Sequence, residues 1–238
     1  MIRNYIFDLY GTLVDIRTDE AMASLWKRMA LLLSLQGADY SSKGLRIAYI
    51  SAINEQIERR AEEHPAIQKD HIEPEILYAF QSLYTQKGIM PSMDTVKDTA
   101  LFFRTLSMRH IRLFPHAVTV LRMLRTRGKG VYLLSNAQAA FTMPELEKLG
   151  LLPLFDGIVL SSDVGIKKPD SAIFQQLLSQ YRLCPEECLM IGNDGVADIW
   201  GAAAAGMGSR YIHTKQSPDR PDLLPENCKE IRSLQELL

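Results

Sequence analysis

The sequence has few cysteines, no marked excess of charge and no paired histidines. Its three cysteines, Cys184, Cys188 and Cys228, lack the CxxC spacing and the nearby histidines of a zinc site. Free thiols suit a reducing compartment. The formal net charge of -1 provides no general field that attracts nucleic acid or an anionic membrane. Zinc proteins, nucleic-acid binders and membrane-surface proteins are therefore not indicated.

Long apolar runs are also missing. None approaches the roughly 20 residues that cross a bilayer, and Asp8 interrupts the apolar stretch near the start. We therefore expect a soluble, cytoplasmic protein that binds a small-molecule substrate and neither nucleic acid nor membrane. The oligomeric state is not predicted. With 238 residues, of which 47% are hydrophobic, the chain can form one large domain with an insertion.

The spacing of apolar residues differs between two parts of the chain. Between residues 16 and 105, apolar residues such as Leu25, Met29 and Leu33 recur at helical spacing. Elsewhere short apolar runs alternate with amphipathic segments, which is typical of a parallel sheet covered by helices. We predict strands at 2–7, 130–134, 157–160, 188–191 and near 211–212, and helices at 118–125, 172–181, 198–205 and 234–238. The fold class is α/β, a Rossmann-like parallel sheet core (residues 1–15 and 106–238) with an inserted all-helical cap (residues 16–105).

Polar residues follow four of these predicted strands. They are Asp8 with Gly11 and Thr12, then Ser135 and Asn136, then Lys168, and finally Asn193, Asp194 and Asp198. Each group alone is typical of an ordinary turn or loop. The carboxyl ends of parallel strands meet at one edge, which is where open α/β sheets bind ligands. We therefore expect one site at this edge.

The residue types suit phosphoryl transfer. Asp8 is a candidate carboxylate nucleophile, which can split one displacement into two steps. Ser135, Lys168 and backbone amides can neutralise the charge of a phosphoryl group, and Thr12 and Asn136 are further candidates for substrate binding. Oxygen ligands for Mg²⁺ can come from Asp8, the Tyr10 carbonyl and Asp194. Asp198 belongs to the same metal site, where we expect it to lie behind these ligands and fix their positions.

The segments Asp8-Leu9-Tyr10-Gly11-Thr12, Ser135-Asn136, Lys168-Pro169-Asp170 and Gly192-Asn193-Asp194 with Asp198 resemble the four motifs of the haloacid dehalogenase-like hydrolase superfamily. The resemblance implies a Rossmann-like core, an aspartyl-enzyme mechanism and a helical cap that selects the substrate. It covers roughly residues 1–15 and 106–215 and carries no substrate information.

One departure from the pattern is Tyr10. Phosphatases of this superfamily usually have a second aspartate there as general acid and base, a role worth about 10²–10⁴-fold in rate. The 2-haloacid dehalogenase branch has tyrosine, because halide leaves without a proton. If the protein is a phosphatase, Tyr10 predicts a preference for good leaving groups, unless Asp15, Asp19 or Glu20 near the cap hinge supplies the acid.

The fourth motif favours the opposite interpretation. Dehalogenases of that branch need no metal, whereas Asp194 and Asp198 offer two carboxylates for a cation. If Asp198 is aligned with the last acid of the longer form of this motif, however, Asn193 and not Asp194 occupies the position of the first acid. We favour a magnesium-dependent phosphatase-like hydrolase acting on a small phosphorylated metabolite, with Asp8, Tyr10 and Lys168 at its catalytic centre. The alternatives are a metal-independent 2-haloacid dehalogenase and a non-catalytic binding module.

Overall fold

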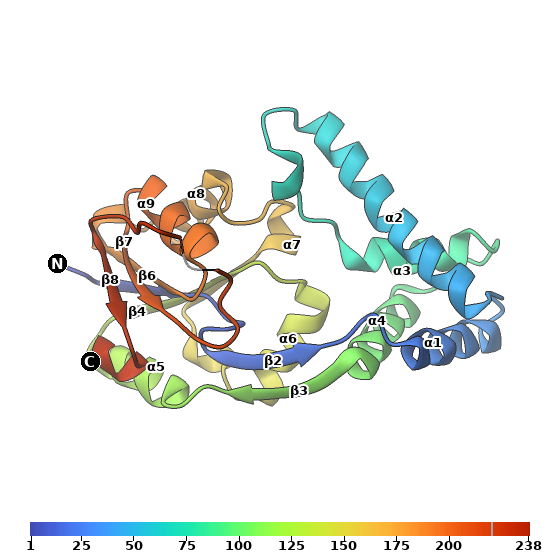
Figure 1. Cartoon of the computed structure of the whole chain (residues 1–238), viewed down its shortest axis with the longest axis horizontal. Coiled ribbons are helices and arrows are strands. Elements are labelled where there is room, and N and C mark those ends of the chain that lie inside the picture. Colours follow the sequence, from blue (N-terminus) through green and yellow to red (C-terminus); the bar gives the residue numbers. More distant parts are fainter. Residues whose placement is uncertain (220) are drawn as a thin grey trace.

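A six-stranded sheet forms the centre of the protein in the computed structural model, which describes residues 1–219 and 221–238. The strand order is β5-β4-β1-β6-β7-β8, and every neighbouring pair is parallel (Figure 1). The strands are β1 (Asn4–Phe7), β4 (Gly130–Ser135), β5 (Gly157–Leu160), β6 (Cys188–Gly192), β7 (Gly208–Ile212) and β8 (Cys228–Ile231). The predicted α/β class with a parallel sheet is confirmed.

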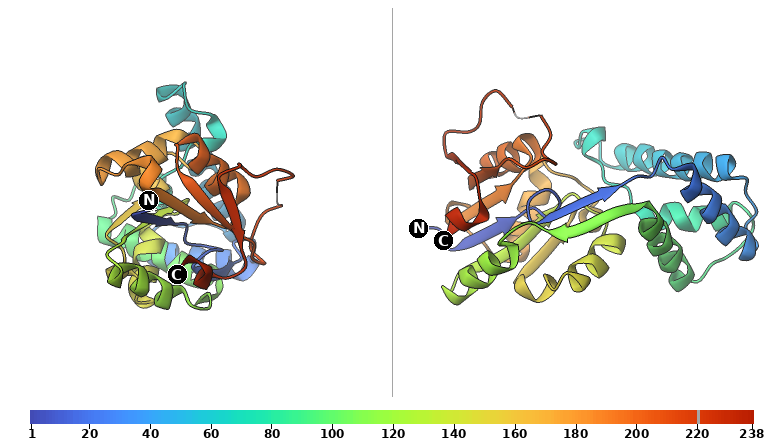
Figure 2. Two further views of the ribbon diagram at one scale, coloured as in Figure 1. Left: turned by 90° about the vertical axis from the view of Figure 1, so that its left-hand side faces the viewer. Right: turned by 60° about the horizontal axis from the view of Figure 1, so that its bottom comes forward.

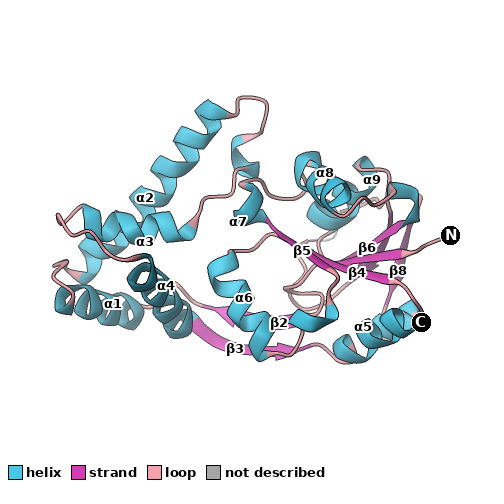
Figure 3. Cartoon of the chain, turned by 180° about the vertical axis from the view of Figure 1, so that it is seen from behind, coloured by secondary structure: helices cyan, strands magenta, loops and turns pink. Residues whose placement is uncertain are grey.

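Helices cover both faces of this sheet (Figure 3). One face carries α5 (Ala117–Thr126) and α6 (Ala139–Lys148), and the other carries α8 (Ser171–Gln180) and α9 (Gly201–Ala204). In β1, Ile6 packs in the cluster that contains α8, whereas Phe7 packs in the cluster that contains α5. Successive side chains of a strand point to opposite faces, so a strand buried on both sides has a continuous apolar sequence.

The inserted segment forms a helical unit with its own core (Figure 1). Its helices are α1 (Ala23–Leu35), α2 (Ser42–Glu63), α3 (Ile76–Thr85) and α4 (Met93–Ser107). The rings of Trp26, Tyr49, Phe80 and Phe103 pack together with centroids 5.2–5.6 Å apart, one from each helix. We call this unit the cap. Its aromatic residues serve packing, as aromatic residues at helical spacing usually do.

Two antiparallel strands that the sequence analysis did not predict join the cap to the core (Figure 2). They are β2 (Val14–Thr18) and β3 (Met108–Leu113). The strand β2 crosses the predicted boundary at residue 15, and β3 begins just after the predicted boundary at residue 106. The division of the chain into core and cap at these residues stays a prediction. Because the strands continue the chain on either side of the cap, they place it over the carboxyl end of β1.

The remaining elements are short. They are α7 (Ser161–Val164), a π-helix (Gly195–Trp200) and 3-10 helices at Lys69–His71, Leu152–Leu154, Pro185–Glu187 and Leu234–Leu237. The predicted helix 198–205 is therefore wrong in type at its start, since Asp198 lies within the π-helix. The sequence analysis also missed α6 and β8. Across residues 1–219 and 221–238, none of the helices combines the length and the apolar character needed to span a membrane.

Candidate active site

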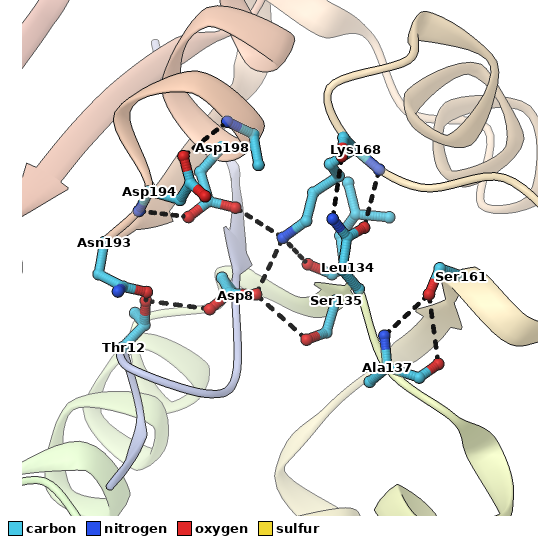
Figure 4. Close-up of polar contacts among 12 residues, drawn as sticks. Asp8, Thr12, Leu134, Ser135, Ala137, Ser161, Lys168, Asn193, Asp194 and Asp198 are labelled. Carbon is cyan, nitrogen blue, oxygen red and sulfur yellow. Dashed lines mark hydrogen bonds and ion pairs between the residues drawn. The ribbon is translucent and has the colours of Figure 1, made fainter. Parts of the chain in front are cut away.

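A cavity of about 170 Å³ opens at the carboxyl edge of the sheet. Its lining comes from the ends of β1, β4 and β6, from the loop before α8 and from the loop after β7 (Figure 4). The lining residues include Asp8, Tyr10, Ser135, Asn136, Lys168, Asn193, Asp194, Asp198 and Gln216. Of the predicted site residues, only Thr12 is not part of this lining. The expectation that the polar strand ends meet at one edge is thus met.

Asp8 lies directly after β1, almost fully buried. Its backbone N–H donates to the Ile191 carbonyl of β6 (2.9 Å), which extends the sheet by one residue and fixes the start of the turn. Oxygen Oδ1 accepts hydrogen bonds from the Ser135 hydroxyl (3.1 Å) and from Lys168 Nζ (2.9 Å). The carboxylate is thereby held in one orientation at the floor of the cavity.

Lys168 is fully buried and its ammonium group has three acceptors. Besides Asp8, Nζ donates to Asp198 Oδ1 (2.6 Å) and to the Leu134 carbonyl (2.8 Å). Burial alone lowers the pKa of a lysine, but the neighbouring Asp198 and Asp8 carboxylates outweigh it and raise the pKa of Lys168. Lys168 therefore remains charged at neutral pH and offsets the negative charge of Asp8.

The backbone around Lys168 is locked to the end of β4. The Asn136 side chain donates to the Lys168 carbonyl (2.9 Å) and accepts from the Lys168 N–H (2.7 Å). This pairing accounts for an asparagine directly after Ser135. In this structure Asn136 positions the lysine as well as lining the cavity, so its predicted substrate contact remains a prediction.

Asp198 lies behind Lys168. Its Oδ1 is occupied by the lysine, and its Oδ2 accepts the backbone N–H of Asp194 (3.0 Å). The preceding Gly192 makes room for it, because a Cβ at that glycine would lie 2.1 Å from Asp198 Oδ2. Burial raises the pKa of Asp198, and repulsion from Asp8 acts in the same direction while Lys168 opposes it. With both oxygens engaged by the protein, Asp198 is placed to order the site rather than to bind a cation directly.

Thr12 lies on the other side of Asp8, fully buried and outside the cavity. Its hydroxyl is within hydrogen-bond distance of Asp8 Oδ2 (3.2 Å) and of Asn193 Oδ1 (3.1 Å). The turn needs glycine at position 11, because φ is +90° there and a Cβ would lie 2.4 Å from the Asn193 amide. Thr12 thus contacts the nucleophile in this structure, and its predicted contact with substrate stays a prediction.

Asp194 and Asn193 have different environments. Asp194 Oδ1 caps the following π-helix by accepting from the N–H groups of Val196 (2.9 Å) and Ala197 (2.8 Å). Within residues 1–219 and 221–238, its Oδ2 accepts no hydrogen bond. Asn193, by contrast, contacts the nucleophile turn through Thr12. The described residues contain no group of three or more His, Cys, Asp and Glu side chains arranged to hold a metal ion.

The Tyr10 side chain points away from Asp8 toward helix α6. Its hydroxyl donates to Glu145 Oε2 (2.5 Å) and lies 3.1 Å from the Thr142 hydroxyl. Burial, reinforced by the negative charge of Glu145, raises the pKa of Tyr10 well above its ordinary value. Arg104 from the cap pairs with the same carboxylate through Nε (2.7 Å). Tyr10 therefore keeps its proton at neutral pH and cannot serve as a general base.

The sequence analysis missed Glu145 and Arg104 because neither belongs to a motif. The sequence held only a weak indication of this contact. Glu145 lies between apolar residues of segment 139–148, and a glutamate that becomes buried there needs a positively charged or hydrogen-bonding partner. Both partners come from distant parts of the chain, so sequence spacing does not reveal them.

A second cleft, of about 410 Å³, lies between cap and core. Tyr10 and Asn136 line it as well as the first cavity, so the two spaces adjoin. Of the three candidate replacement acids, only Glu20 lines this cleft, and burial raises its pKa. Asp15 is bound by His110, Arg112 and Lys215, and Asp19 pairs with Arg109 on the surface.

Comparisons with known proteins agree with this geometry. The model of the haloacid dehalogenase-like hydrolase family matches residues 2–206. A phosphoserine phosphatase from Thermus thermophilus is 32% identical over 125 residues, which are 52% of this chain and 49% of that protein. The chain thus spans about half the length of that curated relative. Phosphatase names recur among the relatives, including glyceraldehyde 3-phosphate and phosphoglycolate phosphatases.

Solved structures extend the likeness to the whole chain. A HAD-hydrolase from Bacillus subtilis, YfnB, described as bound to magnesium, has a TM-score of 0.57 and 25% identity, covering 99% of this chain and 96% of that one. A 2-haloacid dehalogenase from Pseudomonas syringae has a TM-score of 0.61 and 22% identity, covering 100% of this chain and 96% of that one. The second likeness shows the fold alone.

Proposed function

The chain belongs to the haloacid dehalogenase-like hydrolases, and from this premise we propose that it is a phosphatase-type hydrolase in which Asp8 is the nucleophile. The observation that carries the proposal is the buried contact between Asp8 and Lys168, closed from behind by Asp198. A lysine shared by two carboxylates places a buried positive charge against Asp8, an arrangement that suits a carboxylate nucleophile and that a mere scaffold does not require.

In the proposed reaction one oxygen of Asp8 attacks phosphorus, and the bond to the leaving oxygen breaks. Ser135 and Lys168 line the same cavity. Their donors are bound to Asp8, Asp198 and the Leu134 carbonyl, and the equatorial oxygens of a phosphoryl group would compete with these acceptors for them. Water then attacks phosphorus in the aspartyl phosphate, which releases phosphate and restores the Asp8 carboxylate. Asn136 and Thr12 hold Lys168 and Asp8 in place throughout.

The donor atoms suit a magnesium ion. Asp8, Tyr10 and Asp194 line one cavity, and only one of the two Asp194 oxygens accepts hydrogen bonds within the described residues. Mg²⁺ is commonly bound by one or two carboxylates together with waters and substrate phosphate. Such an ion neutralises phosphate charge. We propose Asp8, the Tyr10 carbonyl and Asp194 as its ligands and, because both oxygens of Asp198 are engaged, a supporting role for Asp198.

The environment of Tyr10 supports the leaving-group preference. The Tyr10 hydroxyl is bound to Glu145 and Thr142, so the residue two positions after the nucleophile is not placed to protonate a departing alkoxide. Acyl and aryl phosphates need no such proton. We expect acetyl phosphate to be hydrolysed at least about tenfold more efficiently than a sugar phosphate. Equal efficiency on the two would contradict this preference and point to Glu20 as a replacement acid.

A 2-haloacid dehalogenase is the second candidate. Two observations favour it. The Tyr10 hydroxyl is bound to Glu145 and is not placed to protonate a leaving group, and a neutral Asn193 rather than an acid lies against the nucleophile turn. Names among the curated relatives favour the phosphatase instead.

The test compares phosphate release from p-nitrophenyl phosphate and acetyl phosphate, with and without magnesium, with chloride release from 2-chloropropionate. Magnesium-dependent phosphate release that disappears in Asp8→Asn supports the proposal. Metal-independent chloride release would establish the dehalogenase. A folded protein with neither activity would be the non-catalytic module.

A further inference from the structure

A separate cavity of about 360 Å³ lies at the same edge of the sheet, beside β7 and β8. It is bounded by the residue before α5, the segment after β7 and the segment after β8. Its charged or titratable lining residues are His116, His213, Lys215 and Arg232, and no aspartate or glutamate lines it. We call it the basic cavity. None of its residues lines the cavity at Asp8.

The positive charge of this cavity is not balanced by its surroundings. Lys215 contacts Asp15 (2.9 Å), but Arg112 (2.8 Å) and His110 (3.0 Å) contact the same carboxylate. A single carboxylate cannot offset both Lys215 and Arg112. The nearby Glu236 carboxylate accepts the backbone N–H groups of Arg232 and Ser233 and does not line the cavity.

Two of the four side chains have no partner. In the described chain, neither the His116 imidazole nor the Arg232 guanidinium forms a hydrogen bond or ion pair. His213 is oriented by its contact with the Tyr211 hydroxyl (3.1 Å). The guanidinium of Arg232 thus retains its full fork of donors, the geometry that matches phosphate oxygens.

The backbone at His116 holds its side chain at the cavity. His116 has φ +67°, a left-handed conformation that is uncommon for a residue with a side chain. It is the N-cap of α5, a helix of 10 residues, and its side chain does not cap the helix. The Ala117 N–H donates to the Phe114 carbonyl (3.3 Å), and of α5 and its N-cap only His116 lines the cavity.

We propose that the basic cavity binds a phosphate-type anion, either inorganic phosphate or the phosphate group of a small metabolite. Arg232 and His116 supply direct donors, Lys215 supplies charge, and His213 lines the wall between them. The cavity does not suit a cation, because no aspartate or glutamate lines it. This site is independent of the function proposed for Asp8.

Occupancy of the basic cavity acts on the active site through one short segment. Thr214, in the cavity wall, donates to the Gly11 carbonyl in the nucleophile turn (2.9 Å). Gln216 then reaches Asp15 (2.7 Å), and Ser217 lies 3.5 Å from the Asn193 amide. An anion held by His213 and Lys215 restrains this segment and with it the turn that carries Asp8.

The test follows the histidine ring signals of the full-length protein by NMR while inorganic phosphate is added at constant ionic strength. His116 and His213 should shift together and saturably, whereas His64 on the exposed end of the cap should not. Arg232→Gln should weaken this saturation about tenfold, the loss of one charge-assisted phosphate contact. Arg122→Gln, an equal charge change at an exposed site on α5, should leave it unchanged.

A second arm with adenosine monophosphate distinguishes the source of the phosphate group. Tighter saturation by the monophosphate assigns the cavity to a metabolite, and equal saturation assigns it to inorganic phosphate. Competitive inhibition of turnover by phosphate reports the Asp8 site and should be unchanged in Arg232→Gln. Shifts that chloride reproduces, or that saturate at the same phosphate concentration in Arg232→Gln as in the unmodified protein, would overturn the proposal.

Discussion

Arg104 Nε of the cap lies 2.7 Å from Glu145 Oε1 of core helix α6, and both side chains are about nine-tenths buried. The same carboxylate accepts the Tyr10 hydroxyl, two residues after the candidate nucleophile. Arg104 also lies over the rings of Tyr10 and Phe141. One ion pair thus ties the position of the cap to the turn that carries Asp8.

Removing one side of this ion pair should destabilise the protein strongly. Arg104→Met leaves the Glu145 carboxylate buried without its cation, which typically costs about 3–5 kcal/mol. Arg104→Met with Glu145→Leu should recover much of that loss, because both charges are then absent. Urea unfolding can follow the two parts separately through Trp26 in the cap and Trp200 in the core. A double variant no more stable than the single one would contradict the pairing.

Lys168→Met should abolish turnover and reduce stability, because the buried Asp8 and Asp198 would then face each other without a cation. We expect at least about 10³-fold lower turnover, since the lysine is proposed to contact the transferred group. Adding Asp198→Asn should restore part of the free energy of unfolding but none of the turnover. Recovery of both would mean that Lys168 has only a structural role.

Gly192→Ala tests the close approach of Asp198. The added methyl group would overlap the carboxyl group, displace it from Lys168 and lower turnover, by about tenfold or more if Lys168 moves with it. Gly88→Ala is the matched control: nothing lies within 4 Å of its Cβ, and the change meets only the strain of φ +74°. The control should lose about 1 kcal/mol of stability and keep its turnover. Equal losses of turnover in both variants would refute the account of Gly192.

Stability should depend on pH through Asp15, which joins β2, β3 and the segment after β7. Although burial opposes it, hydrogen bonds from His110, Lys215 and Arg112 hold the pKa of Asp15 well below its ordinary value. A lowered pKa stabilises the folded state above the unfolded pKa of about 3.9, and that contribution is lost as pH falls through the folded pKa. Asp15→Asn should therefore cost about 1 kcal/mol at pH 5–8.

The same Asp15→Asn deficit should shrink progressively below about pH 4. Urea unfolding of both proteins across this pH range gives the difference directly. Asp19→Asn, which removes an exposed pair with Arg109, should change stability less at every pH. A deficit for Asp15→Asn that grows as pH falls would contradict the account.

The strands β1, β4, β5 and β6 were predictable because each is a short apolar run that ends in a polar turn. The meeting of Asp8, Ser135 and Lys168 could be predicted from these strands, since a parallel sheet brings its strand ends together. The strands β2 and β3 were not predicted, because Met108–Leu113 carries Arg109, His110 and Arg112 and resembles an exposed loop in sequence. Their pairing depends on contacts between segments about 95 residues apart.

Roles within the site were less predictable than membership. Thr12 and Asp198 belong to motifs, yet the structure places them behind the nucleophile and the lysine, where sequence spacing gives no direction. The partner of Tyr10 was invisible for another reason. Glu145 lies in α6, a helix with a proline inside it, and its sequence shows no local sign of a contact 135 residues away.

The most direct test of the central claim is capture of the covalent intermediate on Asp8. The enzyme would be mixed with acetyl phosphate and magnesium, quenched in acid within one turnover, and the peptide spanning Asp8 weighed by mass spectrometry. We predict a gain of one phosphoryl group on that peptide and no gain in Asp8→Asn. Continued phosphate release by Asp8→Asn, or a phosphoryl group found on another residue, would contradict the account.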